Sequence, residues 1–191
     1  MAAPRGPTLS TARLILRRWT EDDLAPFAIL NADPEVMHFF PQPLTMAESD
    51  ALVQRIEAQF DDRGFGLWAV ERAADGAFLG FTGLAVQRFD GPPGHVIEVG
   101  WRLASSAWGQ GYATEAGREA LRFGFEVANL PEIVSFTSPL NEPSVRVMER
   151  LGMHHDPADD FDYPRLPPGH PLRHHVLYRL TAEEFAHQRA R

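Results

Sequence analysis

The segment from Trp108 to Thr114 has the residue types of an anion-binding loop. It reads Trp-Gly-Gln-Gly-Tyr-Ala-Thr and lies between an expected strand, 95–103, and an expected helix, 112–127. Two glycines allow a ligand to approach the backbone closely, and the start of the helix presents free N–H groups at the positive end of its dipole. These features favour phosphate or pyrophosphate. A flexible connection between strand and helix explains a lone Gly-x-Gly equally well.

The loop fits a dinucleotide-binding fingerprint poorly. Thr114 stands where that fingerprint has its third glycine, and the strands before the loop form a meander instead of β-α-β units. A nucleotide-binding reductase is therefore a remote alternative.

Hydrophobic patterning around the loop predicts one mixed α/β domain. Strands are expected at 12–19, 68–72, 78–86, 95–103, 133–137 and 175–180, and helices between Thr20 and Asp33, from Thr45, at 112–127, from Asn141 and from Thr181. The sheet should be mostly antiparallel with helices on both faces. Residues 1–8 are expected to form a flexible tail, and residues 9–191 the domain.

Composition excludes several classes of function. The 191 residues carry a formal charge of −8, contain no cysteine and have no run of Lys and Arg. Binding of nucleic acid through phosphate contacts, disulfides and thiolate chemistry are therefore not expected. The sequence shows neither a leader-like apolar stretch nor a membrane-spanning run, so we expect a cytoplasmic protein.

A wider set of motifs resembles a known family. After the loop come a long helix, a strand, Asn-x-x-Ser from Asn141 and Leu-Gly-Met from Leu151. This order resembles the GNAT superfamily of N-acetyltransferases, and more narrowly the branch with the ribosomal-protein N-terminal acetyltransferases. The segments Thr-Ala-Arg-Leu-Ile-Leu-Arg and Val-Leu-Tyr-Arg-Leu are also similar to that branch, so the resemblance spans Leu9 to Leu180.

The resemblance implies that acetyl-CoA binds as co-substrate in a splayed cleft between strands 95–103 and 133–137. The pyrophosphate would bind the backbone of Trp108, Gly109, Gln110, Gly111, Tyr112, Ala113 and Thr114. The pantetheine arm would pair with the strand edge formed by Val99, Gly100, Trp101 and Leu103. Asn141 contacts the cofactor in the family, and it fits equally well as only the N-cap of the following helix.

Glu98 is the candidate general base. An alkylammonium has a pKa near 10 and must lose a proton before it attacks a thioester, and Glu98 lies on the strand that would line the cleft. A structural ion pair with Arg102, on the same strand face, is the alternative. Backbone N–H groups of Gly100 or Trp101 are candidates for stabilising the oxyanion.

Ser144 is the candidate partner of the leaving thiolate. Many members of the family place a tyrosine four residues before the glycine that ends the helix, but this chain has Met148 there. The ribosomal-protein branch has instead a serine in Asn-x-x-Ser, which Ser144 matches. This departure favours a serine or no side-chain acid.

Other residues carry weaker signals. Phe39, Phe40 and Trp68 fall where such enzymes form the acceptor pocket, and core packing explains Trp68 at least as well. The histidines between 154 and 175 lack the spacing of helical metal ligands, so no metal is expected. The aspartates between 156 and 162 are expected to be a solvated surface, with electrostatic steering of a cationic substrate as the second interpretation.

We therefore expect an acetyl-CoA-dependent N-acetyltransferase that acts on a primary amine by direct attack in a ternary complex. A non-catalytic acyl-CoA-binding module on the same fold is the alternative. The expected partners are acetyl-CoA and an amine acceptor, and neither nucleic acid nor a membrane. The sequence leaves open whether the chain forms a homodimer.

Overall fold

The computed structural model describes residues 6–189, and the expected tail at residues 1–5 lies outside the described residues. Gly6 is buried, and the indole of Trp68 donates a hydrogen bond of 2.8 Å to the carbonyl of Pro7. At residues 6–8 the chain therefore already packs against the domain. The boundary of the domain stays a prediction.

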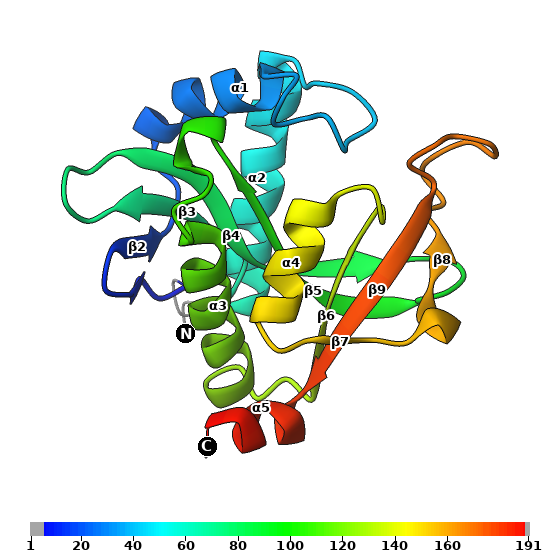
Figure 1. The fold of residues 1–191 in the computed structure, drawn as a ribbon. Coiled ribbons are helices and arrows are strands. Elements are labelled where there is room, and N and C mark those ends of the chain that lie inside the picture. The colour runs from blue at the N-terminus through cyan, green and yellow to red at the C-terminus, as the bar shows by residue number, and fades with distance from the viewer. Residues whose placement is uncertain (1–5, 190–191) are drawn as a thin grey trace.

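Within residues 6–189, nine strands form one sheet, and helices cover both of its faces (Figure 1). The strands are β1 (Leu9–Ser10), β2 (Leu14–Arg17), β3 (Leu67–Arg72), β4 (Phe78–Arg88), β5 (His95–Leu103), β6 (Glu132–Thr137), β7 (His154–His155), β8 (Phe161–Asp162) and β9 (His174–Thr181). The helices are α1 (Leu24–Ala32), α2 (Met46–Arg63), α3 (Tyr112–Glu126), α4 (Glu142–Arg150) and α5 (Ala182–Arg189), with short 3-10 turns at Glu21–Asp23, Ser105–Ala107 and Pro157–Asp159.

The strand order is β1-β2-β3-β4-β5-β6-β9-β7, with β8 paired to β9. Every pair is antiparallel except β5 with β6. This confirms the mixed, mostly antiparallel sheet, and the one parallel pair is the place where the expected cleft should open.

The helix that follows the loop packs on the sheet through small residues. Ala116 and Ala120 on α3 are fully buried, and a Cβ atom at Gly124 would lie 2.5 Å from Cδ1 of Ile133 on β6. Glycine is therefore needed for this close approach. In Figure 1, α3 and α4 cross one face of the sheet while α2 passes behind β4.

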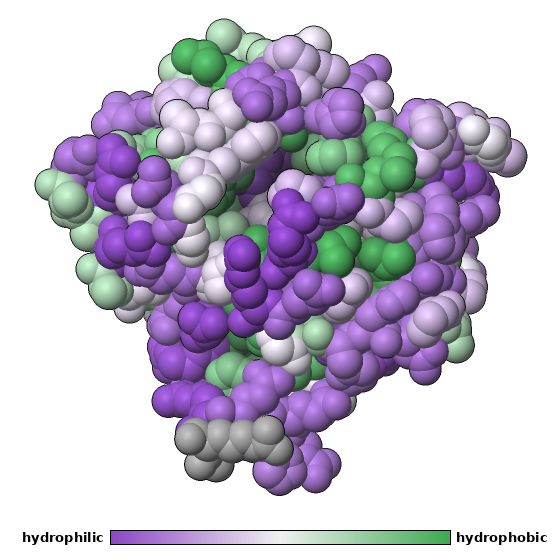
Figure 2. Space-filling view, in the orientation of Figure 1, coloured by the Kyte–Doolittle hydropathy of each residue, from purple (hydrophilic) through white to green (hydrophobic). Residues whose placement is uncertain are grey.

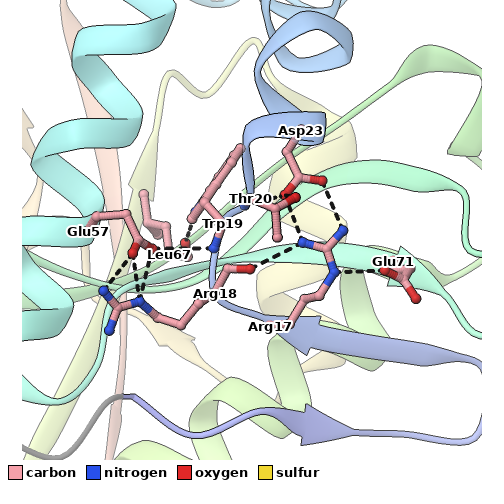
Figure 3. A network of polar contacts seen from close by, with 8 residues as sticks. All are labelled: Arg17, Arg18, Trp19, Thr20, Asp23, Glu57, Leu67 and Glu71. Carbon is pink, nitrogen blue, oxygen red and sulfur yellow. Dashed lines mark hydrogen bonds and ion pairs between the residues drawn. The ribbon is translucent and has the colours of Figure 1, made fainter.

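Two arginines at the end of β2 fix α1 and α2 (Figure 3). Arg17 pairs with the buried Asp23 at 2.7 Å, just before α1, and also with Glu71 at 2.7 Å. Arg18 pairs with Glu57 on α2 at 2.5 Å. Removing Arg17 would leave the buried charge of Asp23 uncompensated, so this pair holds the start of α1 in place, while the partly exposed pair of Arg18 and Glu57 links β2 to α2.

Within the described residues, no helix is both long and apolar enough to cross a membrane.

Candidate functional site

β5 and β6 separate at Glu98. β5 pairs with β4 along its whole length, from His95 to Leu103, whereas its register with β6 contains a single pair, Glu98 with Val134. On both sides of Glu98, at residues 95–97 and 99–103, this edge of β5 therefore has no register partner among the described strands. The cofactor cleft predicted from the sequence would use the second stretch, which carries Val99, Gly100, Trp101 and Leu103.

The loop at residues 108–114 leads directly from this cleft to α3. Gly109 and Gly111 have positive φ angles of 72° and 79°, which glycine adopts without strain. Gly111 is the N-cap of α3, and no side chain caps this end of the helix. A Cβ atom at Gly109 would meet nothing within 4 Å. The loop thus presents an open backbone and the positive end of a helix dipole, which fits a pyrophosphate.

Arg13 and Thr11, near the N-terminus, bind this loop and the first turn of α3. Arg13 donates to the carbonyl of Gln110 at 3.0 Å and pairs with Glu115 at 2.6 Å, and Thr11 donates to the same carboxylate at 2.6 Å. The guanidinium also lies 4.6 Å from the ring centroid of Tyr112. Sequence reasoning missed these contacts because they join segments about a hundred residues apart.

Glu98 lies half-buried at the point where the strands separate. Its Oε2 accepts a hydrogen bond of 2.6 Å from Gln87 on β4. Burial raises the pKa of Glu98 to about 7, while this bond and the charge of Arg165 oppose the rise. A carboxyl group with a pKa near neutral is suited to exchange protons with a substrate.

The alternative role of Glu98 was an ion pair with Arg102, and the described residues contain no such pair. Arg102 instead donates to Oδ1 of Asn31 at 2.6 Å and lies over the ring of Phe40 at 4.1 Å. Glu98 is therefore free of a cationic partner within ion-pair distance.

Ser144 faces the cleft from the other side. Its hydroxyl accepts a hydrogen bond of 3.3 Å from the indole N–H of Trp101, so the contact crosses from β5 to α4. Asn141 caps α4 through the backbone N–H of Ser144 and donates to Thr137 on β6. Met148 is fully buried in the core.

The three aromatic candidates for the acceptor pocket have different environments. Phe39 and Phe40 are half-exposed in the connection between α1 and α2, and Phe40 faces Arg102 on β5. Trp68 is fully buried between Phe60 and Phe123. The structure thus places Trp68 in the core instead of a pocket, because its large ring fills the space where α2 and α3 meet the sheet.

The polar segment at residues 154–175 covers the sheet beside Glu98. Its Phe161 and Tyr163 pack with Phe89 and Phe136 in a second apolar cluster. Its aspartates are bound locally: Asp159 to Arg179, Asp160 to His155 and Asp162 to Arg173. Among the described residues, no group of His, Asp and Glu has the arrangement of a metal site.

Comparison with known proteins gives consistent matches. The sequence model of the acetyltransferase (GNAT) domain family matches residues 13–154. The FsC-acetyl coenzyme A-N(2)-transacetylase of Aspergillus fumigatus is 34% identical over 186 residues, which cover 94% of this chain and 78% of that protein.

Solved structures share the fold. An acetyltransferase from Agrobacterium tumefaciens superposes with a TM-score of 0.72 at 30% identity, covering 91% of this chain and 94% of the other. Spermidine N-acetyltransferase from Vibrio cholerae, solved in complex with CoA and spermine, superposes with a TM-score of 0.72 at 19% identity, covering 92% and 99%.

Proposed function

Because the chain belongs to the GNAT acetyltransferase family and is an acetyl-CoA-dependent N-acetyltransferase, we propose that it acetylates a primary amine by direct attack in a ternary complex. In this proposal Glu98 is the general base and Ser144 serves the leaving thiolate. The observation that carries it is the position of Glu98, a carboxyl group whose pKa burial raises to about 7, where β5 and β6 separate.

Three surfaces would hold acetyl-CoA in this arrangement. The backbone of residues 108–114 would bind the pyrophosphate, and the unpaired edge of Val99 to Leu103 would bind the pantetheine arm like an added strand. Asn141, which caps α4, would contact the arm with its remaining N–H. Figure 2 shows a mainly hydrophilic face with small apolar clusters beside α4, and such apolar surface suits an aliphatic arm.

The space for the amine lies over Gly100. A Cβ atom there would meet Glu98 Oε1 at 3.7 Å and no atom of another residue within 4 Å, so the strand face next to the carboxylate is open. The substrate arrives as an ammonium, and Glu98 would take one of its protons, directly or through water, before the neutral nitrogen forms a bond to the thioester carbon. Because an alkylammonium has a pKa near 10 and Glu98 a pKa of about 7, only a small fraction of the bound amine is neutral at any moment, and the attack consumes it as it forms.

The carbon–sulfur bond then breaks, and the sulfur leaves as a thiolate with the electron pair of that bond. The second proton lost by the nitrogen, which its new bond to carbon makes acidic, passes to this thiolate. A thiol has a pKa near 8.5 and needs only weak assistance, so a hydrogen bond from Ser144 is adequate. The indole of Trp101 occupies one lone pair of the serine oxygen, which leaves the hydroxyl hydrogen free to point at the sulfur. The candidate donor to the oxyanion is the backbone N–H of Gly100 or of Trp101, since neighbouring N–H groups of a strand point to opposite edges and one of the two faces the open edge.

The test is free-thiol release from acetyl-CoA with a panel of amines, with detection of the acetylated product by mass spectrometry. Thiol release that depends on the amine, with one acetylated amine formed per thiol, would support the proposal. Tight binding of acetyl-CoA without amine-dependent thiol release would contradict it and favour the non-catalytic module.

A further inference from the structure

Arg102 is a cation without an anionic partner. It lies on β5, and the ion pairs of the described residues do not include it, whereas most of the other arginines have a carboxylate within 4 Å. Burial alone lowers the pKa of Arg102 to about 10, so it is still charged at neutral pH. Arg102 is half-buried and its Nε is fully buried, and a partly desolvated charge without a counter-ion is costly, so such a residue marks a place where an anion can bind.

The guanidinium is held in one position by neutral groups. Nη1 donates to Oδ1 of Asn31, and the amide nitrogen of Asn31 donates to Ser49 at 2.9 Å. Both of these polar residues are fully buried. The ring of Phe40 lies 4.1 Å from the guanidinium carbon, and that of Phe81 lies at 5.5 Å. The side chain is thus preorganised before any ligand arrives.

The hydrogen-bonding capacity of this guanidinium is largely unused. Arginine has five N–H donors, and one of them has a protein acceptor among the described residues. Its Nε is buried and has no hydrogen-bond partner among the described residues. Nη2 makes no hydrogen bond with the described residues and is not among the buried atoms, so its N–H groups can donate to a ligand.

Arg102 and Glu98 lie on the same face of β5, with Gly100 between them. Side chains alternate along a strand, and four residues span about 13 Å between the two Cα atoms. The open space over Gly100 lies between a carboxylate and a guanidinium that do not pair with each other. This face is complementary to a molecule that carries an amine at one end and an anion at the other.

We propose that Arg102 binds a carboxylate of the acceptor, so that the preferred substrates are amines of the amino-acid class and not plain polyamines. This inference rests on the proposed function, because it assigns the acceptor of the same site. The amine end lies toward Glu98, and the carboxylate receives hydrogen bonds from the guanidinium beside Phe40.

The test compares amines that differ only in the carboxylate: lysine with cadaverine, and ornithine with putrescine. Thiol release from acetyl-CoA gives kcat/KM for each. Because a hydrogen bond to a charged group is strong, we expect the acid-bearing member of a pair to be favoured by about 10- to 100-fold, mainly through KM. In Arg102→Gln this ratio should fall to nearly one, and Arg102→Lys should retain part of it.

Arg63→Gln, a change at an exposed arginine that ends α2, is the matched control and should keep the wild-type ratio. Equal use of both members by the wild type, or an unchanged ratio in Arg102→Gln, would overturn the inference and leave the proposed function standing. An equal loss on both members in Arg102→Gln would show that the residue only holds Phe40 and would also overturn it. If Arg102→Gln does not fold, the wild-type ratio and the ratio in Arg102→Lys test the inference instead. If the wild type releases no thiol with any amine, the proposed function itself is overturned.

Discussion

The proposed acetyl-CoA site is formed mainly by backbone atoms, whereas the proposed acceptor site is formed by side chains. The part proposed for acetyl-CoA is made of backbone: the unpaired edge of β5, two glycines with positive φ and the uncapped start of α3. The part proposed for the acceptor is made of side chains from separate segments: Glu98 and Arg102 on β5, and Phe40 before α2.

This difference has a consequence for specificity. A backbone surface changes little when side chains change, so it suits a co-substrate that is the same throughout a family. A surface of side chains can change by single substitutions, so it suits an acceptor that differs between relatives.

The largest effect is expected at the acceptor end. Glu98→Gln removes the proposed base and should lower kcat/KM by ~10²–10⁴, the usual contribution of general base catalysis. The affinity for acetyl-CoA should hardly change, because the backbone surface is untouched. Glu183→Gln, at an exposed position on α5, is the control. A variant of Glu98 with wild-type kcat/KM would refute the role of the carboxylate.

The next largest effect is expected in the backbone loop proposed to bind acetyl-CoA. Gly111→Val places a β-branched residue at a φ of 79° and should weaken acetyl-CoA binding by about tenfold or more, since strain of this kind costs of order 1–3 kcal/mol. Gly64→Val is equally strained, at a φ of 75° after α2, and should lower the melting temperature without changing this affinity. Calorimetry that shows equal affinities in both variants would sink the assignment of the loop.

A smaller effect is expected where the two ends meet. Ser144→Ala should lower kcat by roughly one to two decades, the value of a hydrogen bond to a charged group. Ser144→Thr keeps the hydroxyl and should restore much of the rate. The backbone N–H of Ser144 binds Asn141 and is present in all three proteins, so the cap of α4 remains. An unaltered kcat in Ser144→Ala would mean that solvent protonates the thiolate.

The same difference explains what could be predicted from the sequence. The strand at 95–103 was predicted with the bounds of β5, and the helix expected from Thr45 is α2, where the structure shows a capping box between Thr45 and Glu48. Local signals such as alternation, capping and glycine pairs identify elements and backbone surfaces, because the residues responsible are neighbours in the chain.

Contacts between distant segments gave no local signal. Trp68 is an aromatic residue on a strand in either role, and only the packing of Phe60 and Phe123 around it identifies a core position. The spacing of Arg102 and Glu98 on one strand suggested an ion pair between them. The actual partners of Arg102 are Asn31 on α1 and Phe40 in the segment after α1, which are distant in the sequence. The segment 154–175 has no helical or strand periodicity in its hydrophobic residues. Its arrangement depends on ion pairs such as that of Asp159 with Arg179 on β9, which local sequence signals do not indicate.

The pH dependence of kcat/KM for the wild type and Glu98→Gln tests the central claim most directly. Glu98 accepts a proton only when ionised, and burial raises its pKa to about 7, so wild-type kcat/KM should fall as the pH drops through 7. In Glu98→Gln that step should be absent, leaving only the rise at higher pH where the amine itself loses its proton. The deficit of the variant should therefore grow as the pH rises through 7, where only the wild type gains an ionised carboxylate, and should shrink at higher pH, where the amine loses its proton unaided. The same step near pH 7 in both proteins, with a constant ratio between them, would contradict the assignment of Glu98 as the base.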